Sequence, residues 1–230
     1  MKLKIAYAVA VLSLAGCGGG INTSLTIGGS VTTTVTNPTY PIAAAVSTFL
    51  QSSNDYTLNA TLGADTYQLS WHSEPGTPSV FEGHVASTLN YTNTITKNGS
   101  SFAGSALTDY FDVVPFKPFG GINRTLGNYD VASNQQVLPS AALPGQSGFV
   151  NNGVRYIDSS KSQILATSVT SWVLEAAGAS NAWACLNSAI TQAGSASVTT
   201  ESVCYKIDTS GNVSAMKIDL TINGQTLNFQ

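Results

Sequence analysis

Along most of the chain, apolar and polar residues alternate one by one, which is the pattern of a β-strand with one buried face. The alternation is clear at Tyr67, Leu69 and Trp71, which are separated by Gln68 and Ser70. Similar runs predict further strands at residues 128–138, 150–157, 163–176 and 213–222. The pattern as a whole predicts a chain that is mostly β, with about ten strands.

The second of two Asn-Gly pairs gives the clearest hairpin, because Asn-Gly between alternating runs is the strongest short-range hairpin signal. A turn at Asn223-Gly224 sets apolar residues opposite apolar residues: Leu220 opposite Leu227, and Ile218 opposite Phe229. We therefore expect the chain to end in a tight antiparallel hairpin.

The first Asn-Gly pair, Asn98-Gly99, predicts a less regular hairpin. A two-residue turn there pairs Ile95 with Phe102. Further along the second strand the apolar positions change parity, and a change of parity indicates an extra residue in one strand. We expect that β-bulge near Gly104.

One segment near the N-terminus has the period of a helix instead of a strand. Its apolar residues fall four, seven and eight positions after the first, so that they form one stripe: Ile42, Val46, Phe49 and Leu50. Pro41 suits the first helical turn, and the polar residues 52–55 end the pattern. The segment predicts one amphipathic helix that packs on the β-structure.

Two cysteines, Cys185 and Cys204, are symmetric about the junction of Gly194 and Ser195. A hairpin that turns at this junction sets the two cysteines opposite each other on neighbouring strands. In an oxidising compartment such a pair forms a disulfide, and we expect this one to do so. The alternative is a pair of free buried thiols.

Taken together, these elements predict one antiparallel meander with one N-terminal helix. Consecutive strands joined by short turns favour a curved sheet or an open or closed barrel. The alternative is a two-layer β-sandwich. We expect residues 41–230 to form a single domain around one core.

The first 17 residues combine a positive start with a short apolar run. Lys2 and Lys4 precede the apolar residues 5–14, which are too few to cross a bilayer as a helix of about 20 residues. The run ends in Leu14-Ala15-Gly16-Cys17, where small residues follow an apolar core as in a removed signal peptide. This string resembles the lipobox of bacterial lipoproteins. We therefore expect residues 1–16 to be an export signal.

The resemblance to bacterial lipoproteins implies a lipid anchor on Cys17. In that family the cysteine sulfur receives a diacylglycerol, the signal is removed before the cysteine, and the new amino group is acylated. Several acyl chains anchor a protein stably in a membrane. Gly18 stands where enteric lipoproteins of the inner membrane carry Asp, so the family's sorting rule implies the outer membrane of the cell envelope. The alternative is an ordinary secretory signal that ends near a cysteine.

Residues 17–40 contain no charged residue and are rich in Gly and Thr. Such a composition predicts a flexible tether between the membrane and the domain. The alternative is a first hairpin that turns at Gly28-Gly29, because the surrounding Val and Thr residues favour strands.

Charge and motifs exclude several classes of function. The chain has 9 basic and 12 acidic residues, and loss of Lys2 and Lys4 with the signal leaves 7 against 12, which argues against binding nucleic acid. The string Gly145-Gln146-Ser147-Gly148 falls short of the hydrolase motif G-x-S-x-G. The sequence also has no zinc-protease, phosphate-loop or dinucleotide motif. We expect a protein that is not an enzyme and has no cofactor.

The segment from His72 to His84 is the one candidate for metal chemistry, because its polar residues form a palindrome. A hairpin centred on Pro78 sets His72 opposite His84 and Glu74 opposite Glu82, all on one face. Two imidazoles and two carboxylates within cross-strand reach are a donor set for a divalent metal such as Zn²⁺. The alternative is an exposed polar face without a metal.

Residues 115–121 are the one candidate for a ligand or partner loop. Their two prolines argue against a central strand. Phe116 and Phe119 on a Pro/Gly loop are suited to cover an apolar ligand or contact a partner. The alternative is a loop that folds both aromatic rings back onto the core.

Three functions follow from these observations. The first is a non-enzymatic envelope lipoprotein whose β-domain binds another protein or has a structural role. The second is a carrier or sensor of an apolar lipid, because a helix followed by a long meander resembles the half-open barrel of periplasmic lipoprotein carriers. The third is a metal-dependent enzyme that uses the hairpin from His72 to His84. A filled interior favours the first function, and an open apolar cavity favours the second.

Overall fold

The computed structural model describes residues 38–222 and 224–230, which form one α-helix and a 13-stranded antiparallel sheet. The export signal, Cys17 and the tether up to residue 37 lie outside the described residues. The helix is α1 (Ile42–Leu50). The strands are β1 (Asn54–Leu62), β2 (Asp65–Pro75), β3 (Ser79–Phe81), β4 (His84–Lys97), β5 (Ser100–Val113), β6 (Phe116–Asn123), β7 (Tyr129–Ser133), β8 (Ser147–Tyr156), β9 (Ile164–Ala176), β10 (Asn181–Gln192), β11 (Val198–Asp208), β12 (Val213–Ile222) and β13 (Gln225–Phe229).

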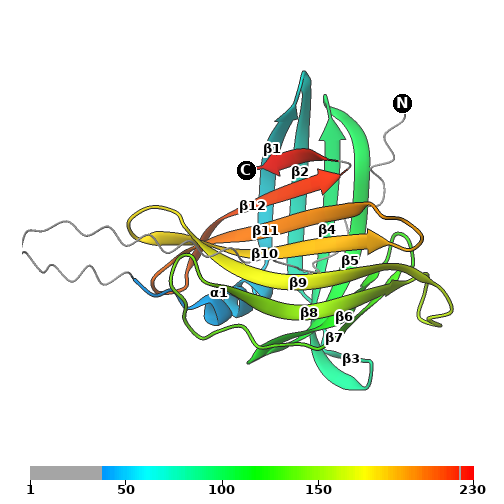
Figure 1. Ribbon diagram of the computed structural model, residues 1–230, viewed down its shortest axis with the longest axis horizontal. Helices are drawn as coiled ribbons and strands as arrows, with labels where there is room; N and C mark the ends of the chain where they lie inside the picture. The colour runs from blue at the N-terminus through cyan, green and yellow to red at the C-terminus, as the bar shows by residue number, and fades with distance from the viewer. Residues whose placement is uncertain (1–37, 223) are drawn as a thin grey trace, which may run out of the picture.

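The strands follow one another around a single curved sheet, so the expected meander is confirmed. Each strand pairs with its neighbour in the chain, except that β2 pairs with β4 and the short β3 pairs only with β4. The sheet curls into a nearly closed barrel, in which β8–β12 cross β1–β5 at a steep angle (Figure 1). Two backbone hydrogen bonds between Asn59 of β1 and Gln230, 3.0 and 3.1 Å long, join the first strand to the end of the last. The alternative of a two-layer sandwich is therefore wrong.

Both Asn-Gly hairpins form. Leu220 pairs with Leu227 and Ile218 with Phe229, as the sequence predicts, although residue 223 itself lies outside the described residues. At the first hairpin Asn98 and Gly99 have φ angles of 48° and 78°, which are those of a type I′ turn.

The bulge in the first hairpin lies two residues earlier than expected. Ile95 pairs with Ala103 and Thr96 with Ser101, so the extra residue is Phe102, not Gly104. The bulge turns Phe102 toward Tyr67 on β2, where the ring centroids are 6.0 Å apart. An aromatic contact is thus gained at the point where the ladder is interrupted.

The disulfide is confirmed. Cys185 on β10 pairs directly with Cys204 on β11, and their sulfur atoms are 2.07 Å apart. The symmetry of the two cysteines about the turn therefore predicts the right register for this hairpin.

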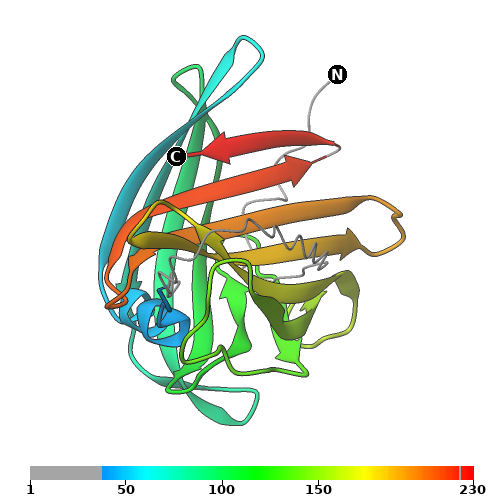
Figure 2. The same ribbon diagram turned by 60° about the vertical axis from the view of Figure 1, so that its left-hand side comes forward.

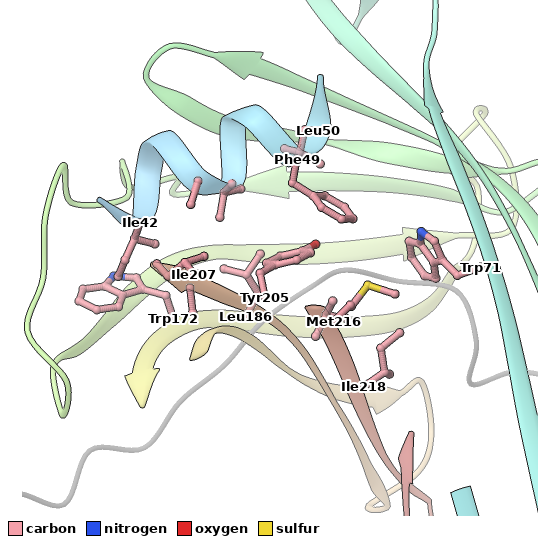
Figure 3. Close-up of a cluster of buried hydrophobic side chains, with 14 of the residues drawn as sticks. Ile42, Phe49, Leu50, Trp71, Trp172, Leu186, Tyr205, Ile207, Met216 and Ile218 are labelled. Carbon is pink, nitrogen blue, oxygen red and sulfur yellow. The ribbon is translucent and has the colours of Figure 1, made fainter. Parts of the chain in front are cut away.

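Helix α1 packs inside one end of the barrel (Figure 2). Its stripe is buried as predicted, with exposed fractions of 6% or less for Ile42, Val46, Phe49 and Leu50. Phe49 lies against Tyr205 of β11, with ring centroids 4.4 Å apart (Figure 3). The helix thus closes an apolar core to which many strands contribute. No helix in the described ranges is long and apolar enough to span a membrane.

The domain begins before residue 41. Tyr40, the last residue of the expected tether, is 1% exposed and belongs to the core. It exchanges two backbone hydrogen bonds with Ala142, 2.9 and 3.0 Å long. These contacts fix the chain at the start of α1, so the boundary expected at residue 41 is at least one residue too late.

Candidate functional site

A row of cross-strand pairs on the inner face of four neighbouring strands carries two aspartates and one arginine. On β5, Asp109 lies two residues after the buried Leu107, so the two side chains point to the same inward face of the strand. Asp109 pairs with Gly121 of β6, Gly121 with Asp130 of β7, and Asp130 with Arg155 of β8. Two carboxyl groups and one guanidinium therefore project from the same wall into the interior.

Gly121 provides the space in which the Asp109 carboxylate lies. A Cβ atom at position 121 would be 2.7 Å from Oδ1 of Asp109 and 3.1 Å from the carbonyl oxygen of Thr108. Any larger residue would push the carboxylate away. The glycine also leaves nothing but backbone between Asp109 and Asp130, so the two acidic side chains influence each other across it.

The guanidinium of Arg155 is paired with Asp130. Its Nε donates a hydrogen bond of 2.9 Å to Oδ1 of Asp130, and both side chains are largely buried, with exposed fractions of 8% and 17%. Burial raises the pKa of Asp130 above its usual value, and the bond to Arg155 opposes that rise. A buried pair with one good bond holds Asp130 in a fixed orientation.

Glu201 on β11 adds a third buried carboxyl group. It is 8% exposed, and its Oε2 atom has no hydrogen-bond partner among the described residues. Burial raises its pKa to about 8; the charge of Arg155 lowers it, and that of Asp109 raises it further. Glu201 is therefore largely protonated at neutral pH.

Asp109 is in a similar state. Burial raises its pKa to about 8, the charge of Asp130 adds to the rise, and a hydrogen bond from the Tyr91 phenol opposes it. Tyr91 is held by stacking on Trp71, with ring centroids 4.7 Å apart. Asp109, Asp130, Arg155 and Glu201 are called the interior ionic cluster below.

A cavity of about 60 Å³ lies between α1 and the interior ionic cluster. Val46 and Leu50 of the helix line one side of it, and Asp109 and Asp130 line the other. Asn151 of β8 also lines it, is 3% exposed, and has an Oδ1 atom with no hydrogen-bond partner among the described residues. The cavity is therefore apolar toward the helix and rich in hydrogen-bond acceptors toward the sheet.

The expected hairpin from His72 to His84 does not form, which is a correction to the sequence analysis. β2 pairs with the later part of β4, so that His72 faces Thr92 and Glu74 faces Asn90. In the same register Trp71 faces Asn93 and Tyr67 faces Lys97. His72 instead contacts Asp55 on β1, with 2.8 Å between Nδ1 and Oδ1.

The reason is a second tight turn within the same segment. Glu82 and Gly83 have φ angles of 50° and 79°, and they close a small hairpin in which Phe81 pairs with His84. This hairpin packs on the outside of the barrel, where the Tyr129 hydroxyl donates a hydrogen bond of 2.7 Å to Glu82 and Lys161 also binds Glu82. His84 stacks on Phe119, with ring centroids 4.5 Å apart.

The four residues proposed for metal binding are therefore split between two places. His72 and Glu74 lie on β2, where His72 contacts Asp55 of β1, whereas Glu82 and His84 belong to the outer hairpin. Within residues 38–222 and 224–230, no three His, Cys, Asp or Glu side chains are arranged to hold a metal ion. The palindrome does not correspond to a shared face.

Residues 116–121 of the expected loop are instead part of strand β6, which lies between β5 and β7 in the sheet. β7 pairs with β6 only through Gly120–Ile122, so Pro118 has β5 as its single neighbouring strand, as the preference of proline for a strand edge requires. A bulge lets Phe111 face Pro118 while Tyr110 faces Gly120. The extra residue is Phe119.

The bulge sends the two phenylalanines to opposite faces of the sheet. Phe116 is 7% exposed and packs in the interior core, with its ring centroid 6.1 Å from that of Phe111. Phe119 is 3% exposed and packs outside the barrel with Phe81. Both rings therefore pack against the protein itself, which agrees with the alternative to a ligand or partner loop. Phe116 also lines the cavity.

The interior ionic cluster was missed by the sequence analysis, although the sequence carries a signal for it. Asp109 falls in the apolar phase of its strand between Leu107 and Phe111, and Glu201 falls in phase with Val203 and Tyr205. A charged residue in an otherwise apolar phase indicates a buried charge. Only the paired strands show that these charges meet.

Comparison with known proteins adds no relative from which a role can be transferred. The sequence matches no family model, and it has no match among curated proteins or solved structures.

Proposed function

We propose that this protein is a lipid-anchored protein of the bacterial cell envelope whose barrel domain has a non-enzymatic binding or structural role. The anchor rests on the lipobox Leu14-Ala15-Gly16-Cys17. The role of the domain rests on one observation, namely that side chains fill the inside of the barrel. The outer membrane is the compartment that Gly18 favours.

The filled interior is what separates this proposal from a lipid carrier. Large side chains from the helix and from opposite strands meet inside the barrel, among them Tyr205, Leu174 and Phe229, each 1% exposed or less. Trp71 of β2 and Ile218 of β12 point into the same space (Figure 3). The cavity between α1 and the interior ionic cluster measures about 60 Å³. An apolar cavity of about 150 Å³ holds one benzene molecule, so this cavity has no room for an acyl chain.

The small volume of this cavity also argues against a hydrolase. Buried carboxyl groups with raised pKa values, such as Asp109 and Glu201, occur in the active sites of hydrolases. A hydrolase must also hold its substrate beside them, and about 60 Å³ does not admit a sugar ring or a peptide. The carboxyl groups are better suited to hold something small.

The carrier alternative is tested by lipid binding. The mature chain with Cys17→Ser, which has no acyl groups of its own, is titrated into a fluorescent fatty acid. The proposal predicts no saturable binding. Saturable binding that a non-fluorescent fatty acid displaces would overturn it in favour of a carrier.

The anchor is tested by fractionating the cells that make the protein. Wild type is expected in the membrane pellet and Cys17→Ser in the soluble envelope fraction, because loss of the acyl chains removes about 0.8 kcal/mol of membrane affinity for each buried CH₂ group. Retention of the Cys17→Ser chain in the pellet after a high-salt wash would contradict a lipid anchor.

A further inference from the structure

We propose that the interior cavity binds a small aliphatic primary ammonium ion, whose three N–H groups donate hydrogen bonds to the carboxylates of Asp109 and Asp130 and to the Asn151 side-chain carbonyl. The inference rests on the proposed binding role of the barrel and names the chemistry of its ligand.

The first observation is the unpartnered oxygen of Asn151. The Asn151 side chain is buried, and its amide nitrogen donates a hydrogen bond of 3.1 Å to the backbone carbonyl of Asn152. Its Oδ1 atom has no partner among the described residues, and Asn151 is one of the residues that line the cavity. Leaving a buried carbonyl unpaired is costly. A donor in the cavity removes that cost.

The second observation is the balance of charge around the cavity. The interior ionic cluster contains three carboxyl groups, which share the single guanidinium of Arg155, and the Nε of that guanidinium is bonded to Asp130. A single positive charge beside Asp109 compensates the carboxylate when it ionises. The cluster is therefore suited to a monovalent cation, whereas the side chains in the described part of the chain do not form a divalent metal site.

The third observation is the match in number and shape. A primary ammonium group has three donors and no acceptor, and Asp109, Asp130 and Asn151, which each carry a side-chain acceptor, line the cavity. On the scale of benzene in about 150 Å³, the space holds about two or three non-hydrogen atoms. Val46 and Leu50 form the apolar wall on the helix side. An ethylammonium ion has this size, a charged end and an apolar end.

The raised pKa of Asp109 makes binding depend on pH. Groups from four strands act on Asp109 or lie in its row: Tyr91 of β4, Asp130 of β7, Arg155 of β8, and Glu201 and Tyr205 of β11. Because the pKa of Asp109 is about 8, the carboxyl group must lose a proton when the cation enters at neutral pH. Affinity then rises up to about tenfold for each pH unit between about pH 6 and 8.

The test is calorimetric titration of ethylammonium chloride into the mature chain carrying Cys17→Ser, at about pH 8.5. Ethanol, which is neutral and of the same size, and potassium chloride at equal ionic strength are the competitors. We expect saturable binding of ethylammonium that weakens at least tenfold by about pH 6.5, and no saturable binding of ethanol. Equal binding of ethylammonium and potassium would overturn the ammonium assignment. No saturable binding of either ion would overturn the whole proposal in favour of water as the occupant.

Two variants decide whether the cavity is the site. Asp109→Asn removes the charge and Asn151→Leu removes the carbonyl, and each is expected to weaken ethylammonium binding at least tenfold. Asp112→Asn, on the same strand as Asp109 but in the opposite phase, is the matched control and is expected to bind as wild type does. Wild-type affinity in Asp109→Asn, with circular dichroism showing a folded barrel, would overturn the proposal. If ethylammonium fails to bind and the fatty acid also fails, this inference falls and the proposed function stands.

Discussion

Replacing Asp109 by Asn tests the interior ionic cluster without changing the shape of the side chain. The pKa of Asp109 is about 8 in the folded protein, against an ordinary value of 3.8. Between these two pH values the folded state keeps a proton that the unfolded state has lost. The unfolded state binds fewer protons there, so the free energy of unfolding falls as pH rises from about 4 to about 8. In Asp109→Asn the side-chain amide cannot ionise and does not contribute to that fall.

The size of the effect follows from the shift. Each pH unit in this window costs the wild type up to about 1.4 kcal/mol through Asp109, which amounts to about 4 kcal/mol at pH 7. The carboxyl group faces a cavity large enough for water, so we take half of this value. Asp109→Asn is therefore expected to be about 2 kcal/mol more stable than wild type at pH 7 and of nearly equal stability at pH 4.

The assay is chemical unfolding of wild type and Asp109→Asn at about pH 5, 6, 7 and 8 with the disulfide intact. Asp112→Asn, in the outward phase of the same strand, controls for the loss of one carboxylate. The reasoning is refuted if wild type and Asp109→Asn lose stability equally as pH rises, or if Asp109→Asn is the less stable protein at every pH.

Three further changes test the packing around the cluster. Gly121→Ala puts a Cβ 2.7 Å from Oδ1 of Asp109, and thermal unfolding is expected to show a loss of about 1–3 kcal/mol; unchanged stability would mean that the carboxylate lies elsewhere. The double change Cys185→Ala/Cys204→Ala opens a disulfide of sequence separation 19 and is expected to cost about 2–4 kcal/mol in denaturant unfolding, whereas no loss would show that the thiols are free. Phe116→Ala removes a ring that is 7% exposed, and a loss of about 3–5 kcal/mol is expected; a neutral change would support a mobile lid.

The parts of the fold that the sequence predicts are those defined by local signals. The stripe of α1 depends on residues within eight positions of one another, and both Asn-Gly turns define their own strands. The Cys185–Cys204 pair is predictable because two cysteines and a turn define one register. The expected number of about ten strands is too low, in part because β3 is three residues long and too short to show an alternation of its own.

The errors occur where a neighbour in space overrides a local pattern. The palindrome from His72 to His84 favours one wide hairpin, but Glu82 turns with a positive φ angle because Tyr129 and Lys161 hold its carboxylate. Pro118 is tolerated because β7 does not extend beside it. Neither neighbour can be read from the segment alone.

The candidate site was missed for the same physical reason. Asp109 and Asp130 lie on different strands, on either side of Gly121. Only the register of β5, β6 and β7 shows that the two carboxyl groups are neighbours. Asp109 and Glu201 each fall in the apolar phase of their strands, which indicates burial, but neither strand alone shows that the two side chains meet. Pairing of β5 to β8 brings Asp109, Asp130 and Arg155 together, and the curvature of the sheet adds Glu201 of β11.

A native mass spectrum of the protein released from membranes in mild detergent tests the lipid anchor and the filled interior together. The expected mass is that of the chain from Cys17 onward with covalently bound acyl groups, less two hydrogens for the disulfide, and no additional lipid held non-covalently. A lipid-sized adduct that is lost on denaturation would contradict the filled interior and indicate a carrier.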